Sequence, residues 1–426
     1  MHTSCTLFIK NRSSVTLQPQ ALDYPFVRAF TAGRFAAVAG YQIVSVAVGW
    51  QLYERTGEAW ALGLVGLFEA APVLLFMAPA GHAADRFPRR TVSMCAHAGL
   101  AVAAGGLALV AALDGPVALV YGLVALVGVG RAFAAPAVNT ILPQLLPPLV
   151  FANLNAWVAS SVQLAAIAGP AAGGLIIAAT GGSAAAFAAA AVAEAAFVVL
   201  LLRVPRAPAA PSRRTEGGVL AGLRFVSRNP VFLAAITLDL FAVLFGGAVA
   251  LLPIFAKDIL QVGPSGLGWL RAAPAAGALT MALLQTRRGP WPRPGRALLA
   301  AVAGFGLATI GFGLSRHVGL SLACLYLAGV CDNVSVVIRL TLEQMITPDA
   351  LRGRVSAVKH LFVSMSNEIG AFESGTTAAL FGPIASVVGG GLATIGVVFA
   401  VLWAWPILGR LGPLHTLQPI AENQRL

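Results

Sequence analysis

The sequence predicts an all-α membrane protein with twelve transmembrane helices in two six-helix bundles. Composition, apolar runs and an internal repeat lead to this prediction. Of the 426 residues, 58% are hydrophobic and 10% are charged, whereas soluble domains carry about 25% charged residues. Most side chains must therefore face lipid or other apolar helices. The net charge of +12 does not indicate a nucleic-acid partner, because the arginines are scattered singly along short polar segments.

Twelve apolar runs are each long enough to cross the bilayer as a helix. Residues 1–24 precede them and lack the apolar core of a signal peptide, so we expect a disordered cytoplasmic tail. The first bundle, residues 25–204, contains the runs 25–50, 59–80, 91–113, 116–136, 152–180 and 183–204. The fifth of these runs contains Gly169 followed by Pro170 and is the weakest, so it could be broken there.

A polar linker, residues 205–229, separates the bundles, and we expect its part 217–227 to form a short surface helix. Residues 409–426 after the last run are expected to form a second cytoplasmic tail. The second bundle, residues 230–408, contains the runs 230–255, 265–285, 297–315, 319–338, 355–381 and 384–408.

The basic residues predict how these runs are oriented. If both termini are cytoplasmic, most of the 28 lysines and arginines lie in inner tails and loops, and the outer loops hold only Arg55, Lys257 and Arg316. Such a bias is typical of multi-pass proteins, whose cytoplasmic loops are enriched in basic residues. We therefore expect a protein of the inner (cytoplasmic) membrane.

An internal repeat relates the two halves. The segment 66–72, G-L-F-E-A-A-P, matches 268–274, G-W-L-R-A-A-P, and the segment 128–131 matches 329–332 at nearly the same offset. An even repeat of six helices implies two parallel bundles related by an axis along the membrane normal.

A short polar segment, residues 81–90, lies between the second and third runs and is expected to form a tight turn at the cytoplasmic face. Its pattern resembles the loop between helices two and three of major facilitator superfamily transporters, with Pro88 in place of the usual glycine. The resemblance implies the major facilitator fold and a gating role for the residues that match, which are Gly81, Asp85, Arg86, Arg89 and Arg90. In that role Asp85 would accept hydrogen bonds from a neighbouring helix N-terminus, and the arginines would pair with carboxylates across the seam between the halves.

Further segments resemble one branch of this superfamily in particular. Residues 48–53, 251–256 and 367–374 are similar to the branch of the superfamily that contains the bacterial enterobactin exporter and related drug exporters. Residues Gly169, Pro170, Gly173 and Gly174 resemble the fifth-helix motif of antiporter-type members. Proline bends a helix and small residues allow close packing, so this segment would act as a hinge or seal. The alternative is ordinary packing of small residues.

Charged residues inside the runs are the candidate site, because a charge in the bilayer is costly unless it has a partner or water. In the major facilitator fold, the helices that carry them line the central path. The candidates for the substrate or proton pathway are Arg34, Glu69, Arg131, Asp239, Arg271, Asp332 and Glu373. Proton coupling requires a carboxylate that can take up and release a proton, and those that qualify are Glu69, Asp239, Asp332 and Glu373.

The repeat places residues of opposite sign at equivalent positions: Arg34 with Asp239, Glu69 with Arg271, and Arg131 with Asp332. One interpretation is complementary charge across the path, and Glu69 and Arg271 are the strongest case. The other is local ion pairs within one half. Two further expectations are a stabilising pair of Lys359 with Glu368 on one helix, and a lone packing role for Glu194.

These observations predict a secondary active transporter that exports a small organic molecule, either a siderophore or a drug-like compound, in exchange for protons. We expect a monomer in the lipid bilayer, no cofactor and no metal, since the histidines and four cysteines have no metal-ligand spacing. No phosphate-binding loop for ATP is present. The alternatives are an importer of the same fold, a membrane-embedded transferase enzyme, or a channel.

Overall fold

The computed structural model describes residues 20–206, 218–287, 289, 291–348 and 351–412. The expected tails fall mostly outside these residues; of the N-terminal one, Ala21–Asp23 form a 3-10 turn before the first helix. All regular structure in the described part is helical.

Six long helices make up the first half of the chain: α1 (Pro25–Thr56), α2 (Ala59–Arg86), α3 (Arg89–Ala112), α4 (Val117–Val138), α5 (Phe151–Thr180) and α6 (Ala184–Leu201). Local sequence sets their ends. Pro25 opens α1, where its missing N–H costs nothing. Gly57 and Gly181 end α1 and α5 with φ of 68° and 71°, a left-handed conformation that favours glycine.

The second half repeats this order after the surface helix α7 (Gly218–Arg228), which matches its expected position. The short segments η4 (Ala248–Leu251), α9 (Leu252–Ile254), η5 (Phe255–Ile259, a π-helix) and α15 (Pro406–Gly409) accompany the long helices. The long helices are α8 (Pro230–Phe245), α10 (Gly263–Thr286), α11 (Pro294–Leu314), α12 (Val318–Ile346), α13 (Arg352–Phe381) and α14 (Pro383–Ala404).

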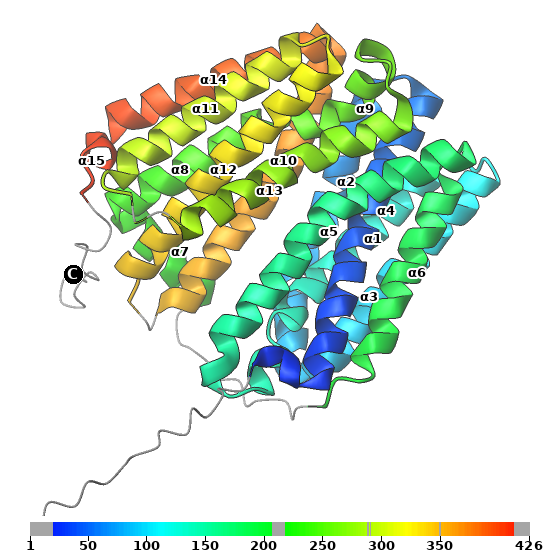
Figure 1. Cartoon of the computed structure of the whole chain (residues 1–426), viewed down its shortest axis with the longest axis horizontal. Helices are drawn as coiled ribbons and strands as arrows, with labels where there is room; N and C mark the ends of the chain where they lie inside the picture. Colours follow the sequence, from blue (N-terminus) through cyan, green and yellow to red (C-terminus); the bar gives the residue numbers. More distant parts are fainter. Residues whose placement is uncertain (1–19, 207–217, 288, 290, 349–350, 413–426) are drawn as a thin grey trace, which may run out of the picture.

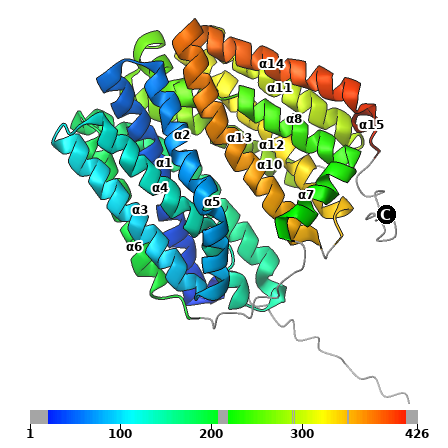
Figure 2. The same ribbon diagram turned by 180° about the vertical axis from the view of Figure 1, so that it is seen from behind.

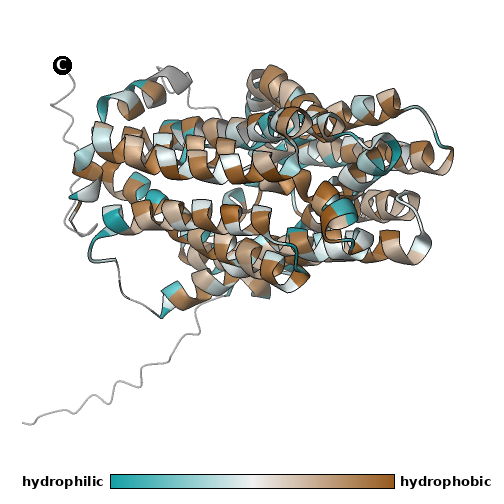
Figure 3. Cartoon of the chain, turned by 90° about the horizontal axis from the view of Figure 1, so that it is seen from above, coloured by the Kyte–Doolittle hydropathy of each residue, from teal (hydrophilic) through white to brown (hydrophobic). Residues whose placement is uncertain are grey.

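Eleven helical segments of the described chain are long and apolar enough to cross a membrane. The twelfth expected span, α13, has 30 residues and carries more charge, but it packs lengthwise against α2 and α8 within the bundle. Large apolar side chains on the outer surface, such as Leu75 and Trp403, are exposed, as expected for lipid-facing positions. Hydrophobic colour predominates along the helices, and hydrophilic colour gathers at loops and helix ends (Figure 3). The twelve-helix prediction is confirmed.

The two halves form separate bundles that meet along two helix pairs, α5 with α10 and α2 with α13 (Figure 1). Seen from either side, the ribbons of the two bundles approach each other near α9 and diverge toward the end that carries α7 (Figure 2). If the termini are cytoplasmic, the end at which the ribbons diverge is the cytoplasmic one.

Several helices differ from the expected runs, whereas α5 matches its run. Helix α2 continues through Arg86, so the polar segment is mostly helical and only Phe87 and Pro88 separate α2 from α3. Helix α5 is continuous through Pro170. The expected run 230–255 is instead interrupted after Phe245, because α13 packs closely here: a Cβ on Gly247 would lie 2.8 Å from the carbonyl oxygen of Gly370.

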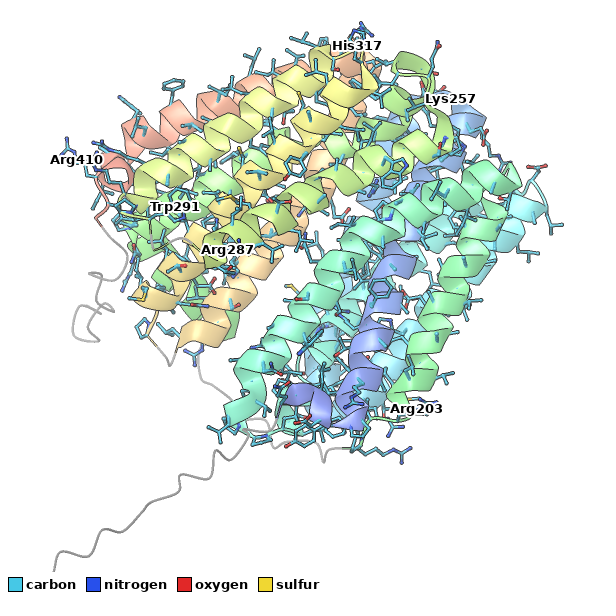
Figure 4. The ribbon with its side chains drawn as sticks, viewed as in Figure 1. Arg203, Lys257, Arg287, Trp291, His317 and Arg410 are labelled. Carbon is cyan, nitrogen blue, oxygen red and sulfur yellow. The ribbon has the colours of Figure 1, made fainter. Side chains whose placement is uncertain are left out.

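The orientation of the chain in the membrane remains a prediction. Lys257 and His317 lie at one end of the helices, and Arg203, Arg287 and Arg410 lie at the other (Figure 4). The second group is expected to face the cytoplasm.

Cysteine labelling tests this orientation. In a chain whose four natural cysteines are replaced by serine, a cysteine introduced at Glu58 or Gly182 should react with a membrane-impermeant maleimide added outside the cell. A cysteine at Arg213 or Arg293 should not react until the membrane is permeabilised, because the basic bias places both inside. Labelling of Arg213→Cys in intact cells would contradict the predicted orientation.

Candidate transport site

A central cavity of about 330 Å³ lies between the two bundles, and both halves line it. The first half contributes side chains from α1, α2 and α4, and the second from the segment 243–253, α10 and α13. Four charged residues face this cavity: Glu69, Arg131, Arg271 and Glu368. Their formal charges sum to zero, so the cavity is polar without a net charge.

Arg131 is the centre of this cluster. Its guanidinium pairs with Glu69 on α2 and, at 3.2 Å, with Glu368 on α13 of the other half. It also lies 4.5 Å from the centre of the Tyr41 ring, a favourable cation–π arrangement. Tyr41 in turn donates a 2.9 Å hydrogen bond to Glu69. One arginine therefore binds two carboxylates from different halves of the molecule.

The backbone explains why Arg131 and Glu69 meet. Gly128 lies about one turn before Arg131, and a Cβ there would lie 2.5 Å from the carbonyl oxygen of Glu69. Only glycine lets α4 approach α2 this closely. Glu69 is buried in this pair, whereas the Arg131 side chain is partly exposed.

Arg271 provides a second contact between the halves. It lies on α10 and donates a hydrogen bond to Ser45 on α1. The guanidinium has five N–H donors, and Ser45 is its one hydrogen-bond partner among the described residues. Its remaining donors are available to a ligand in the cavity.

The expected partners of these charges need two corrections. Glu69 and Arg271 line one cavity, as predicted, but Glu69 pairs with Arg131 and not with Arg271. The expected pair of Lys359 with Glu368 is wrong: Lys359 pairs with Glu343 on α12 at 2.5 Å. Nine residues separate Lys359 from Glu368, which is 2.5 helical turns and places them on opposite faces of α13.

A second cavity of about 360 Å³ lies within the second half, lined by α8, α12 and α13. Asp239 on α8 pairs there with Arg339, which lies within α12, beyond the end of the expected run 319–338. Asp332 lines the same cavity and has no hydrogen bond or ion pair with any described residue. Val243 and Asn367 line both cavities, so the two adjoin.

The remaining charged candidates lie away from the central cavity. Arg34 is near Glu194 in the first half and does not pair with Asp239. Glu194 is not a lone residue, because its carboxylate lies 2.6 Å from Nδ1 of His97, and both are buried. Glu373 accepts a 3.4 Å hydrogen bond from Ser374 and does not line either cavity.

The glycine motif of α5 packs on two neighbours. Gly169 and Gly173 face α1, and a Cβ on Gly169 would lie 2.7 Å from Cβ of Gln42. Gly174 faces α10 across the seam, where its Cβ would lie 2.9 Å from Cα of Gly268, and Gly268 in turn lies against the carbonyl of Pro170. The motif therefore packs closely both within the first half and across the seam. A hinge or seal role for the motif remains a proposal.

The polar segment between α2 and α3 makes its described contacts within the first half. Arg89 donates to the carbonyl of Thr140 at 3.4 Å, and Arg90 donates to that of Leu202 at 3.2 Å. Asp85 and Arg86 are exposed, and neither has a hydrogen bond or ion pair with a described residue. In this conformation the arginines of the segment pair with no described carboxylate across the seam, and Asp85 accepts no hydrogen bond from a described helix N-terminus. The reason is that the bundles diverge at this end.

Asp85→Asn tests the gating role. We expect slower transport with normal membrane insertion, because insertion depends on the apolar helices, whereas Asp85 would form its contacts only when this end closes. Transport and membrane abundance should be measured together over a range of substrate concentrations. Wild-type transport at every concentration would remove Asp85 from gating.

A contact at the opposite end of the molecule was not predicted from the sequence. The hydroxyl of Tyr53 on α1 donates to Asp258 in the π-helix η5, and Lys257 lies 5.7 Å from the centre of the Tyr53 ring. Such π-helical turns often occur at functional sites. The one sequence signal was that Tyr53 belongs to the segment 48–53, which carries the family resemblance.

Comparisons with known proteins agree with this architecture. A family model described as the Major Facilitator Superfamily matches residues 30–371. The enterobactin exporter EntS of Escherichia coli is 30% identical over 387 residues, covering 89% of this chain and 92% of that protein. The protein of that name from Shigella boydii serotype 18 gives the same values.

Solved structures show the same fold at lower identity. A variant of the peptide transporter POT superposes with a TM-score of 0.71 at 16% identity, covering 91% of this chain and 95% of that one. A bacterial homologue of the human lysosomal transporter Spinster, in an inward-facing and occupied conformation, has a TM-score of 0.70 at 16% identity. It covers 94% of this chain and 99% of that one.

Proposed function

The chain belongs to the major facilitator superfamily, and we propose that it is a secondary active exporter of a small organic molecule. It would exchange the substrate for protons across the inner membrane as a monomer, and it would catalyse no chemical reaction. The observation that carries the proposal is the cavity between the halves, in which Arg131 binds carboxylates from both.

Glu368 is the residue we assign to carry the coupling proton. Its pair with Arg131 is its one polar contact among the described residues, whereas Glu69 also accepts from Tyr41. The Glu368 side chain is 18% exposed against 11% for Glu69, so water reaches it more easily. Protonation of Glu368 would remove its attraction to Arg131 and release one link between the bundles.

We propose that this arrangement serves export in the following way. In the conformation that opens toward the expected cytoplasmic end, Glu368 is ionised and paired, and the cavity is ready to take substrate. Opening of the other end requires that the Tyr53–Asp258 hydrogen bond break. A proton from outside would then occupy Glu368 as the substrate leaves, and it would be released to the cytoplasm on return.

The substrate class is proposed from the cavity and the relatives. Arg271 presents unpaired donors that suit an acidic or phenolate oxygen, and the similar chains from Escherichia coli and Shigella boydii are named as exporters of enterobactin. We therefore propose a siderophore or a related drug-like acid as substrate.

Inside-out membrane vesicles test this proposal. Vesicles that contain the protein should accumulate a candidate siderophore when their interior is acid, and a protonophore should abolish the accumulation. Vesicles without the protein are the control. The exporter assignment fails if candidate siderophores and dyes accumulate equally with and without the protein.

A further inference from the structure

The cavity within the second half differs in chemistry from the central cavity. Its wall is mostly apolar and includes Phe232, Leu240, Val336 and Phe362. Its volume of about 360 Å³ falls within the range of small-molecule sites, roughly 300–1,000 Å³. A pocket of this kind binds the apolar body of a ligand and leaves orientation to a few polar groups.

The charges in this cavity leave one carboxylate uncompensated. Arg339 is paired with Asp239, and Lys359 is paired with Glu343. Asp332 is exposed and lines the cavity, and it has no polar partner among the described residues. It lies near the middle of α12, where an ionised group needs water or a counter-charge. Of the described charged side chains that line the cavity, Asp332 is therefore the one with no ion-pair partner.

From this geometry we propose that the cavity binds a lipophilic monocation, whose charge pairs with Asp332 and whose apolar body packs against the apolar wall. Phe362 supplies a partly exposed ring, which attracts a cation further, whereas Phe232 is buried. The central cavity, by contrast, offers the donors of Arg271 to an acidic group. The protein would thus have two adjoining subsites of opposite preference.

This inference rests on the proposed transport function only for the route by which the ligand enters and leaves. Binding itself is a separate property that equilibrium measurements detect without transport. A failure of the subsite and a failure of the exporter assignment can therefore be told apart.

Binding of tetraphenylphosphonium to the purified full chain in detergent tests the subsite. Wild-type protein should bind this cation, and tetraphenylborate, which has the same shape and opposite charge, should not compete. Asp332→Asn should weaken the affinity by about tenfold or more, because the charge-assisted contact to the cation is lost. Asp332→Glu should retain most of it.

Two further variants serve as controls. Asp114→Asn removes a carboxylate from the loop between α3 and α4, far from the cavity, and asparagine tolerates the left-handed backbone there. It should bind like the wild type. Leu340→Trp fills the cavity without changing its charge and should also weaken binding. Equal affinity in the wild type and in folded Asp332→Asn would overturn the proposal, as would competition by tetraphenylborate equal to that of the cation.

Discussion

Arg131→Gln is expected to reduce transport by at least about tenfold while the protein still inserts into the membrane. Arg131 holds Glu69 and Glu368, and its loss leaves both carboxylates without an ion-pair partner, with Arg271 as the other described cation that lines the cavity. Removing one partner of a buried ion pair costs about 3–5 kcal/mol. The cost is smaller here because the Arg131 side chain is 34% exposed, but about 1.4 kcal/mol already changes a rate tenfold.

Two further variants are measured for comparison. Arg131→Lys keeps the charge but cannot bind two carboxylates in the planar fork of a guanidinium, so its activity should be intermediate. Arg203→Gln removes an exposed arginine at the end of α6 and should transport normally. Transport is to be measured per amount of folded protein in the membrane. A wild-type rate for Arg131→Gln on that scale would show that the cluster is dispensable.

Arg271→Gln is the second change for which we expect a large effect, in this case on substrate affinity. Among the described residues the guanidinium donates a hydrogen bond only to Ser45, and Arg271 lines the cavity. Loss of a charge-assisted contact to an acidic substrate should raise KM by about tenfold or more. Ser45→Ala keeps the charge and should change KM much less.

Charge reversal gives an independent check on the same residues. Because the direct partner of Glu69 is Arg131, the swap of Glu69→Arg with Arg271→Glu should not restore transport. Restoration by this swap would show that Glu69 and Arg271 interact directly at some stage of the cycle. A normal KM for Arg271→Gln at normal abundance would remove Arg271 from substrate binding.

The sequence predicts the spans well because the thickness of the bilayer decides how long an apolar run must be. It also predicts the surface helix α7 and the placement of Glu69 and Arg271 in one cavity. The repeat places equivalent residues at the same depth, but depth does not determine the direction in which a side chain points. Arg131 therefore looked like a counterpart of Asp332, whereas it is the partner of Glu69 and Glu368.

Other features of the site depend on packing that no local pattern reveals. Tyr41 and Ser45 look like ordinary residues of an apolar helix, and their roles appear only when α1 is placed beside α2 and α10. The expected pair of Lys359 with Glu368 conflicts with helix geometry, because a spacing of nine residues places the two side chains on opposite faces of one helix. The apolar pattern does not show that helix α8 ends at Phe245, because the residues that follow are also apolar.

The central claim is that protonation of Glu368 couples the movement of the two halves to substrate export. Proton flux during substrate exchange in proteoliposomes tests it most directly, with a pH-sensitive dye inside and wild type compared with Glu368→Gln. The wild type should move protons against substrate, and Glu368→Gln should exchange substrate between the two sides without moving protons. Full proton coupling in Glu368→Gln, or substrate transport without proton movement in the wild type, would contradict the claim.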